Sequence, residues 1–157
     1  MAIYHLEAKM VSRGAGRSAV AAAAYLSCSR MLNEYDGVQH DYTRKQGLGW
    51  RQVFLPATAP AEWQDRETLW NAVEETETAK DSRLAREFVA ALPIELSREK
   101  QIQLLQDFIK EQFVADGMCA DAAIHDPYHG TIFPDHLYKG LQSKPVRRAN
   151  HRRRHFR

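Results

Sequence analysis

The pattern of apolar and polar positions near the start of the chain predicts a strand, a loop and a helix. Residues 3–10 alternate in the manner of a half-buried strand. Two glycines within residues 12–17 break this alternation and are typical of a loop. Ser18 is suited to cap a helix over residues 19–31, because the alanine-rich sequence that follows it favours helix strongly.

Further along, the pattern predicts three more strands and two more helices. The strands are expected at residues 51–55, 85–92 and 120–125. Asp65 and Ser97 are positioned to cap the helices, and Gly117 is expected to end the second one. Residues 33–49 are polar and turn-rich, and they predict an irregular excursion or a short hairpin around residues 38–42. This order of elements indicates an α+β fold, a compact sheet with helices packed on it.

Composition adds constraints on class and compartment. A length of 157 residues suits one ordinary domain, and 44% hydrophobic with 27% charged residues is typical of a soluble globular protein. Cys28 and Cys119 lie far apart in the sequence, which argues against a disulfide framework and favours a reducing cytoplasm. No apolar run approaches the roughly 18 residues of a membrane span, and no secretory signal is visible. We therefore expect a cytoplasmic protein without a membrane segment.

Charge is distributed unevenly along the chain. The formal total is +2, yet residues 144–157 hold one lysine, six arginines and no acidic residue, a formal +7. Subtracting this from the total leaves −5 for residues 1–143, so the body is mildly acidic. We expect a solvated, disordered tail from residue 144 onward, able to bind nucleic acid without sequence preference through counterion release.

Tyr25 lies within the first expected helix, and its residue type permits two interpretations. A tyrosine there is most often an amphipathic core residue, with a buried ring and a hydroxyl that reaches a partner. A phenol can also act as a nucleophile, provided that a nearby base, cation or metal ion activates it. The residues alone leave both interpretations open.

Several other side chains are candidates for a metal site. His125 and Asp126 close the last expected strand, where the default interpretation is a satisfied histidine before a turn. A metal ion would need further ligands, and His129 and His136 are near in sequence but irregularly spaced. Glu87 is either an edge-strand charge or a carboxylate that orients a metal-bound histidine.

Four cations fall in the polar loops, namely Arg13, Arg17, Arg44 and Lys45. Loop cations are usually only solvated. Near a scissile phosphate, however, they would position the backbone of the DNA.

Short stretches in a fixed order carry a resemblance to a known family. They are Ala-Ile-Tyr-His-Leu at 2–6, Ser-Arg-Gly at 12–14, Ser-Ala-Val-Ala-Ala-Ala-Ala-Tyr at 18–25, Asp-Tyr-Thr-Arg-Lys at 41–45, Leu-Trp-Asn-Ala-Val-Glu at 69–74, Arg-Glu at 86–87 running to Ala-Leu-Pro at 91–93, and Gly-Met at 117–118 with Ala-Ile-His-Asp at 123–126. In order and spacing, over about 125 residues, they resemble the MobA/MobL family of plasmid mobilisation relaxases, in the HUH endonuclease group.

This resemblance implies a relaxase-type fold with a central, mainly antiparallel sheet. It also implies that Tyr25 attacks a phosphodiester of single-stranded DNA at a transfer origin, forming a 5′-phosphotyrosyl link and leaving a free 3′-hydroxyl. In the family a divalent metal, Mg²⁺ or Mn²⁺, is held by three histidines and polarises the phosphate. His125 matches the first of these histidines, and Glu87 matches an acidic position beside the metal. Auxiliary mobilisation proteins and a bacterial cytoplasm are further implications.

The chain departs from the family pattern after Asp126. The family continues with a short loop and an Asn-Pro-His-x-His strand, whose two histidines point the same way because side chains alternate along a strand. Here residues 127–136 read Pro-Tyr-His-Gly-Thr-Ile-Phe-Pro-Asp-His, without His-x-His. We therefore divide the chain into residues 1–126, the N-terminal part of an incomplete relaxase domain, and residues 127–157, a divergent segment. A frameshift, an insertion or a fusion would explain the switch.

The missing histidines determine the expected activity. With one of three family ligands, the chain is expected to nick DNA weakly or not at all. His129 or His136 beside His125 would instead rebuild a ligand set. Two alternatives remain: a non-catalytic DNA-binding remnant of a relaxase, and an inert remnant without a stable fold.

Overall fold

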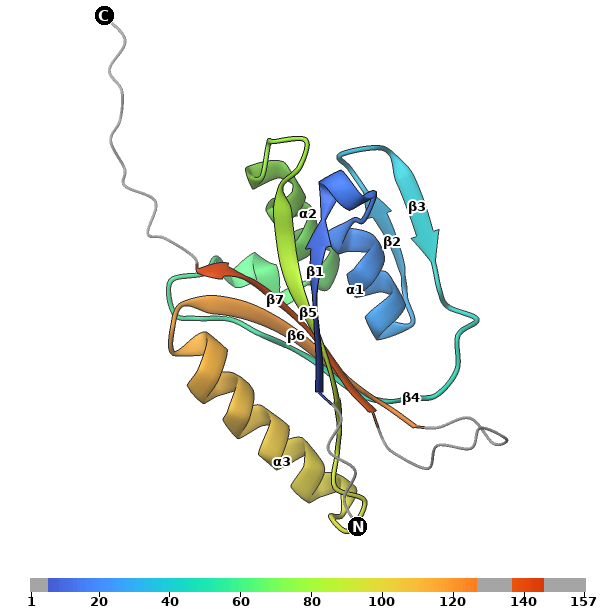
Figure 1. Cartoon of the computed structure of the whole chain (residues 1–157), viewed down its shortest axis with the longest axis vertical. Coiled ribbons are helices and arrows are strands. Elements are labelled where there is room, and N and C mark those ends of the chain that lie inside the picture. Colours follow the sequence, from blue (N-terminus) through green and yellow to red (C-terminus); the bar gives the residue numbers. More distant parts are fainter. Residues whose placement is uncertain (1–5, 127–136, 146–157) are drawn as a thin grey trace, which may run out of the picture.

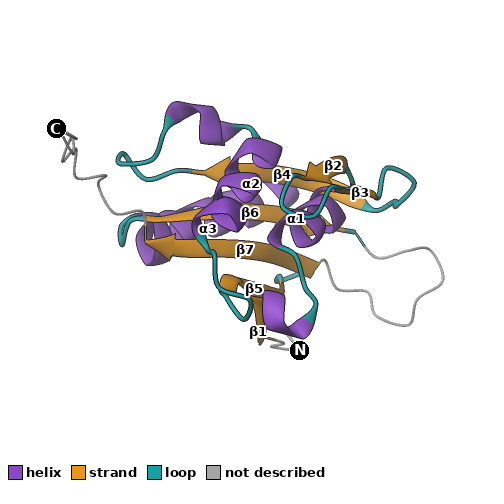
Figure 2. Ribbon diagram, turned by 90° about the horizontal axis from the view of Figure 1, so that it is seen from above, coloured by secondary structure: helices purple, strands orange, loops and turns teal. Residues whose placement is uncertain are grey.

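The computed structural model describes residues 6–126 and 137–145. Its centre is a five-stranded sheet with strand order β1-β5-β7-β6-β4, in which all neighbouring strands are antiparallel (Figures 1 and 2). The strands are β1 (Leu6–Ser12), β4 (Leu48–Phe54), β5 (Arg83–Ala91), β6 (Met118–His125) and β7 (Leu137–Pro145). A separate hairpin consists of β2 (Arg30–Asn33) and β3 (Val38–Asp41). The expected α+β fold with a mainly antiparallel sheet is confirmed.

Helices cover both faces of the sheet, and each face buries its own apolar cluster. On one face lie α1 (Ala19–Ser27) and α2 (Arg66–Thr76), and on the other lies α3 (Arg98–Ile109), which continues into a π-helical turn, η3 (Lys110–Val114) (Figure 1). Two short 3-10 helices are η1 (Arg13–Ala15) and η2 (Ala61–Gln64). Within the described part of the chain, every helix is too short or too polar to cross a membrane.

The three predicted helix caps are present in the structure. Ser18 and Ser97 accept hydrogen bonds from the backbone N–H groups of Ala21 and Lys100, at 3.1 and 3.4 Å. Asp65 accepts from both the N–H and the hydroxyl of Thr68, and these bonds lower the pKa of its carboxyl. Each cap satisfies N–H groups that the first helical turn leaves without a partner.

The first helix is shorter than the sequence predicts. It was expected to continue to Met31, but α1 ends at Ser27 because Cys28 adopts a left-handed conformation, with φ of 50°. The N–H of Cys28 then bonds back to the carbonyl of Ala24. Met31 belongs to β2 instead, where it is buried in the core opposite His40 of β3. The hairpin that the sequence placed around residues 38–42 therefore begins at residue 30.

β7 is the element that the sequence pattern did not indicate. It follows the predicted boundary at Asp126, yet it lies between β5 and β6, with Gly140 opposite both Phe88 and Ala122. Strands β5 and β6 each gain a partner for backbone groups that would otherwise be unpaired. Lys144, where the solvated tail was predicted to begin, is in β7 and forms an ion pair with Glu77. The predictions for residues 1–5, 127–136 and 146–157 lie outside the described residues.

A buried charge joins α2 to the sheet. Asp121 of β6 is fully buried and receives two hydrogen bonds from the Arg66 guanidinium, at 2.6 and 2.8 Å. The indole N–H of Trp70 donates a third, at 3.0 Å. Burial raises the pKa of the Asp121 carboxyl, while the bonds from Arg66 and Trp70 oppose that shift. This bidentate geometry sets the position of α2 along the sheet.

Candidate functional site

Tyr25 is presented to solvent at the last turn of α1. It is 42% exposed, so it is not the buried core residue that its helix position would suggest by default. The ring of Tyr42 meets its ring edge-on, with centroids 5.2 Å apart. The Lys45 ammonium lies 3.8 Å from the centroid of the Tyr25 ring and donates to the Tyr25 carbonyl at 3.1 Å. These contacts fix the ring beside a positive charge.

The segment 42–47 connects the end of α1 to the end of β6. At one end, the N–H of Tyr42 donates to the carbonyl of Ser29, just after α1. At the other, the carbonyl of Gly47 accepts from the N–H of Asp126 at 2.7 Å. Gly47 has φ of 91°, and a Cβ there would lie 2.9 Å from the Asp126 carbonyl oxygen, so a side chain is excluded. Tyr25 and His125 are thus held at the same end of the sheet.

His125 is the last residue of β6 and is 8% exposed. His125 is two residues from Ala123 and four from Asp121, so the three side chains point to the same face of β6. This is the face that α1 and α2 cover. Asp126, the next residue, forms an ion pair with Arg98 at the start of α3. A Cβ on Gly49 would lie 2.8 Å from the Asp126 carboxylate. The end of β6 is therefore enclosed by β4 and by the start of α3.

The opposite end of α1 is held by a buried carboxylate. Glu74 of α2 is 2% exposed and accepts from the N–H of Ala19, the first residue of α1, at 2.7 Å. Its other oxygen accepts from Arg13 at 2.9 Å. Negative charge at a helix N-terminus is stabilising because the exposed N–H groups there carry partial positive charge. Glu74 therefore positions the helix that carries Tyr25.

Arg13 belongs to this internal network. Besides Glu74, it donates to the carbonyls of Glu77 and Ala79, and its guanidinium stacks on the Tyr35 ring at 3.9 Å. Its side chain is 11% exposed. These contacts direct the Arg13 side chain into the protein, where it has a structural role, and its contact with DNA stays a prediction.

Arg17 and Glu87 form an ion pair at 2.7 Å, between the start of α1 and β5. Glu87 is opposite Leu141 of β7, which in turn is opposite Asp121 of β6. His125 is four residues beyond Asp121, so strand geometry separates the Cα atoms of Glu87 and His125 by about 16 Å. The structure therefore does not bring Glu87 next to His125, and the carboxylate holds Arg17 instead.

Of the four loop cations named from the sequence, two belong to the 42–47 segment that contacts Tyr25. Lys45 contacts the ring itself, and Arg44 is exposed one residue earlier in the same segment. Arg13 and Arg17 have the internal partners described above.

The family to which these features belong follows from comparison with known proteins. The sequence model of the MobA/MobL family matches residues 17–140. This range contains Tyr25, the 42–47 segment and His125. The chain belongs to the MobA/MobL family.

Its similarity to individual MobA/MobL relatives is substantial. It is 45% identical to the conjugal transfer protein TraA of Rhizobium radiobacter, in a match that covers 80% of this chain and 12% of TraA. It is 42% identical to a probable mobilization protein MobA of Bifidobacterium longum, covering 83% and 23%, and to the mobilization protein MobL of Acidithiobacillus ferridurans, covering 81% and 33%. The chain thus spans between an eighth and a third of the length of these relatives.

A solved structure has the same architecture. It is described as the molecular basis of vancomycin resistance transfer in Staphylococcus aureus, and it is 31% identical to this chain with a TM-score of 0.81. The match covers 95% of this chain and 79% of that one. The fold therefore agrees over nearly the whole chain.

The metal site implied for the family requires three clustered ligands. The structure describes two histidines, His40 and His125, and His40 is in the β2–β3 hairpin. Among residues 6–126 and 137–145, no three His, Cys, Asp or Glu side chains cluster as a metal site requires. His129 and His136 lie outside these ranges. The described donors therefore do not make up the three-histidine set.

Two positioning residues were not identified from the sequence. Glu74 is within one of the family-like stretches, but its pattern indicates only a helix position. Arg98 looks like an ordinary first-turn residue after Ser97. Both act through contacts distant in sequence, with Ala19 and Asp126, and no local signal identifies such pairs.

Proposed function

We propose that this chain is a relaxase-type protein of conjugative mobilisation, which binds single-stranded DNA at a transfer origin with Tyr25 at the scissile phosphate. The observation that carries the proposal is the exposed Tyr25 phenol beside Lys45, at the end of the sheet where His125 lies. Membership of the MobA/MobL family supports it, because the relatives are named as conjugal transfer and mobilization proteins.

The chemical step proposed for Tyr25 is a transesterification. The phenolic oxygen attacks phosphorus, a phosphotyrosyl bond forms to the 5′-phosphate of the downstream fragment, and the bond from phosphorus to the 3′ oxygen of the upstream fragment breaks. The phenol loses its proton and the released strand ends in a 3′-hydroxyl, so the step is balanced and reversible. Lys45 contributes positive charge where the phosphate would lie, and Glu74 and Arg51 hold the two ends of α1.

We further propose that cleavage by this chain is severely impaired. Among the described residues no three His, Cys, Asp or Glu side chains cluster around His125, and one imidazole holds a divalent ion too weakly for catalysis. Binding of the strand does not require the complete ligand set, because phosphate contacts come from cations and backbone groups.

The deciding experiment measures nicking and covalent attachment together. The protein is incubated with supercoiled plasmid carrying the cognate origin, in Mg²⁺ or Mn²⁺, and with a labelled origin oligonucleotide. We expect little or no nicked plasmid and no denaturation-resistant adduct, with Tyr25→Phe indistinguishable from the parent protein. Efficient nicking that Tyr25→Phe abolishes would contradict the impairment and establish the nucleophile. A Tyr42→Phe variant is the matched control, because it alters a neighbouring phenol.

The second candidate is a non-catalytic DNA-binding protein, which the basic sequence of residues 146–157 favours. It predicts salt-sensitive binding without cleavage. Origin-specific binding that persists after deletion of residues 146–157 would assign the recognition to the folded part. Complete loss of binding on deletion would leave only a generic polycation.

We also propose a bacterial cytoplasmic setting and auxiliary mobilisation proteins as partners at the origin. Relatives named as conjugal transfer and mobilization proteins support both proposals. Co-purification from a conjugating host, with and without the origin plasmid, tests the partners directly.

A further inference from the structure

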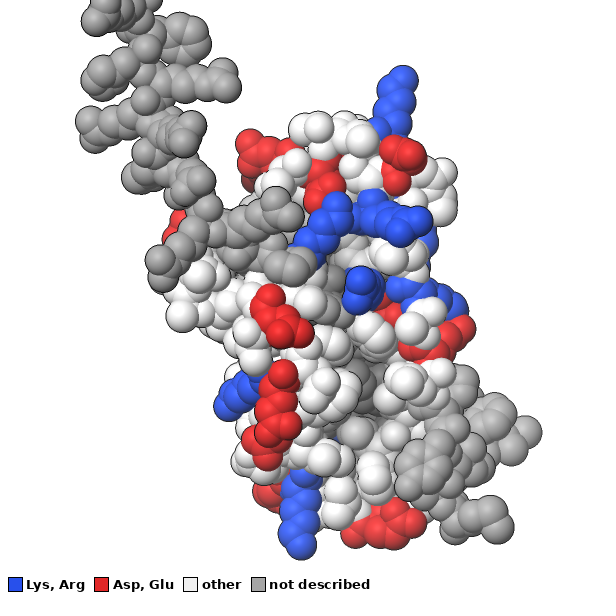
Figure 3. Space-filling view, turned by 60° about the vertical axis from the view of Figure 1, so that its left-hand side comes forward, with Lys and Arg blue, Asp and Glu red and all other residues white. Residues whose placement is uncertain are grey.

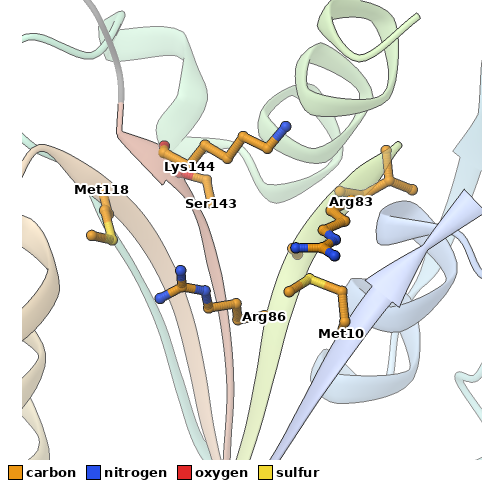
Figure 4. Close-up of a pocket in the computed structure, with 8 residues that line it drawn as sticks. Met10, Arg83, Arg86, Met118, Ser143 and Lys144 are labelled. Carbon is orange, nitrogen blue, oxygen red and sulfur yellow. Dashed lines mark hydrogen bonds between the residues drawn. The ribbon is translucent and has the colours of Figure 1, made fainter. Parts of the chain in front are cut away.

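A pocket of about 200 Å³ opens at the other end of the sheet from Tyr25. It is lined by the first residue of β6, Met118, and by Ser143 and Lys144 near the end of β7, whereas His125 is at the opposite end of β6. Met10 of β1 and Arg83 of β5 lie on its other side, and the Arg86 side chain of β5 extends toward Met118 (Figure 4). Arg86 shares a face with Phe88 of the α3 cluster, whereas Leu84 and Ala85 belong to the α1 and α2 cluster, so residues of both faces line the pocket.

The charges of this pocket are not balanced from within the protein. Arg83 and Arg86 are both exposed, and their side chains form no hydrogen bond or ion pair with any residue that the structure describes. Lys144, by contrast, is paired with Glu77 at 2.6 Å. On the face that Figure 3 brings forward, lysine and arginine side chains lie in the middle and upper parts with acidic side chains among them. Because both guanidinium groups line one pocket, an anion bound there would offset their like charge.

The chemistry of the lining selects the kind of anion. A guanidinium presents a planar set of donors that matches two phosphate oxygens at once. Met10 and Met118 add flexible, polarisable walls, which suit the apolar faces of a sugar or a base. In the sequence, six further arginines follow within residues 146–157, so positive charge continues along the chain after the pocket.

We propose that this pocket binds a phosphodiester of single-stranded DNA, with Arg83 and Arg86 on the phosphate oxygens and the two methionines against the adjoining nucleoside. The proposal rests on the proposed function in taking the same strand as ligand. The pocket is a different site from Tyr25, because the two lie at opposite ends of the sheet. The site anchors DNA at a distance from the chemistry.

The test compares two double variants of the full chain by fluorescence anisotropy with a labelled oligothymidylate. Arg83→Gln with Arg86→Gln removes the two guanidinium groups, and Arg30→Gln with Lys100→Gln removes two exposed cations elsewhere. We expect the pocket variant to bind about tenfold more weakly. The magnitude of the slope of log K against log salt should fall by about 0.7 for each phosphate contact that the variant loses. The control variant should stay within about twofold of the parent protein. Equal losses in the two variants would overturn the proposal, because net charge alone would then explain them.

A second measurement separates this site from Tyr25. Bound oligothymidylate should protect Arg83 and Arg86 from phenylglyoxal, mapped by mass spectrometry, in both the parent protein and Tyr25→Phe. Unprotected Arg83 and Arg86 at saturating oligonucleotide would contradict the pocket whatever happens at Tyr25. Conversely, absence of origin recognition together with protection of the two arginines would refute the proposed function and keep the pocket.

Discussion

The two faces of the central sheet are held by different interactions. On the α1 and α2 face, Glu74 and Asp121 are buried charges, each bound to a guanidinium and to one further N–H donor. On the α3 face the described contacts are mainly apolar: Phe88 and Phe113 stack at 5.5 Å, and Ile109 is fully buried beside them. Directional bonds admit one arrangement of two elements, whereas apolar contact tolerates several.

The polar face therefore positions the helix that carries Tyr25, whereas the apolar face contributes mainly to stability. The helix that carries Tyr25 is fixed at both ends by polar bonds, from Glu74 at its start and from Arg51 to the Ser27 carbonyl at its end. α3 carries no candidate catalytic residue, and its buried area contributes the nondirectional stabilisation of an ordinary core.

The largest effect is expected from Glu74→Ala. It leaves the Arg13 cation buried without its partner and removes the acceptor at the start of α1, so the free energy of unfolding should fall by about 3–5 kcal/mol. Urea unfolding followed by circular dichroism measures it. Glu75→Ala, at the exposed neighbouring position, is the control. Equal small losses of unfolding free energy in both variants would mean that the buried Glu74 contributes no more to stability than the exposed Glu75.

Ile109→Ala tests the apolar face. A cavity in the α3 cluster should lower the free energy of unfolding by about 3 kcal/mol, within the range for such truncations. At temperatures where the variant is folded, its affinity for origin DNA should match that of the parent protein. Leu104→Ala, at a 47% exposed position of the same helix, should cost little. Weakened DNA binding by folded Ile109→Ala would show that the α3 face also positions the site.

The two serine caps give a finer comparison between the faces. Ser97→Ala should cost about 1 kcal/mol, since its oxygen receives only a long bond from Lys100. Ser18→Ala should cost more, because the Ser18 oxygen also accepts from the Asn33 amide at 3.2 Å and so joins α1 to β2. Thermal melts of the two variants under one buffer condition decide the order, and the reverse order would contradict it.

The smallest expected effect is the dependence of stability on pH through Asp65. Bonds from Thr68 lower the pKa of this carboxyl in the folded state, so its contribution is present above the ordinary aspartate pKa. It is lost as pH falls through the lowered value. The carboxyl is exposed, so its contribution is small. In Asp65→Asn the total change of the free energy of unfolding across this pH window should be smaller by about a few tenths of a kcal/mol. A slope identical to that of the parent protein would exclude the assignment.

Local patterns predicted most of the elements, because capping, alternation and apolar spacing are local properties. Ser18, Asp65 and Ser97 begin helices as expected. The early end of α1 was missed because Cys28 adopts its left-handed conformation without a glycine to indicate it, and Met31 is buried in β2 instead. β7 was missed because its residues are mixed in polarity, and its place depends on the unpaired edges of β5 and β6.

The same distinction applies to the site. Tyr25 and His125 could be named from the sequence by their place in family-like stretches. Glu87 could not be placed correctly, since its register with β7 and β6 is a tertiary property. The internal role of Arg13 likewise depends on α2 lying beside η1.

The central place of β7 has a consequence for how the chain folds during synthesis. β1 and β5 form one antiparallel pair and β4 and β6 another, and β7 is the strand that joins them. A ribosome releases residues 137–145 after all four, so the edges of β5 and β6 that β7 later covers stay open until then. Open edges of this kind pair readily with other chains. The time between the emergence of β6 and of β7 is therefore the interval in which a chaperone would protect this protein most effectively.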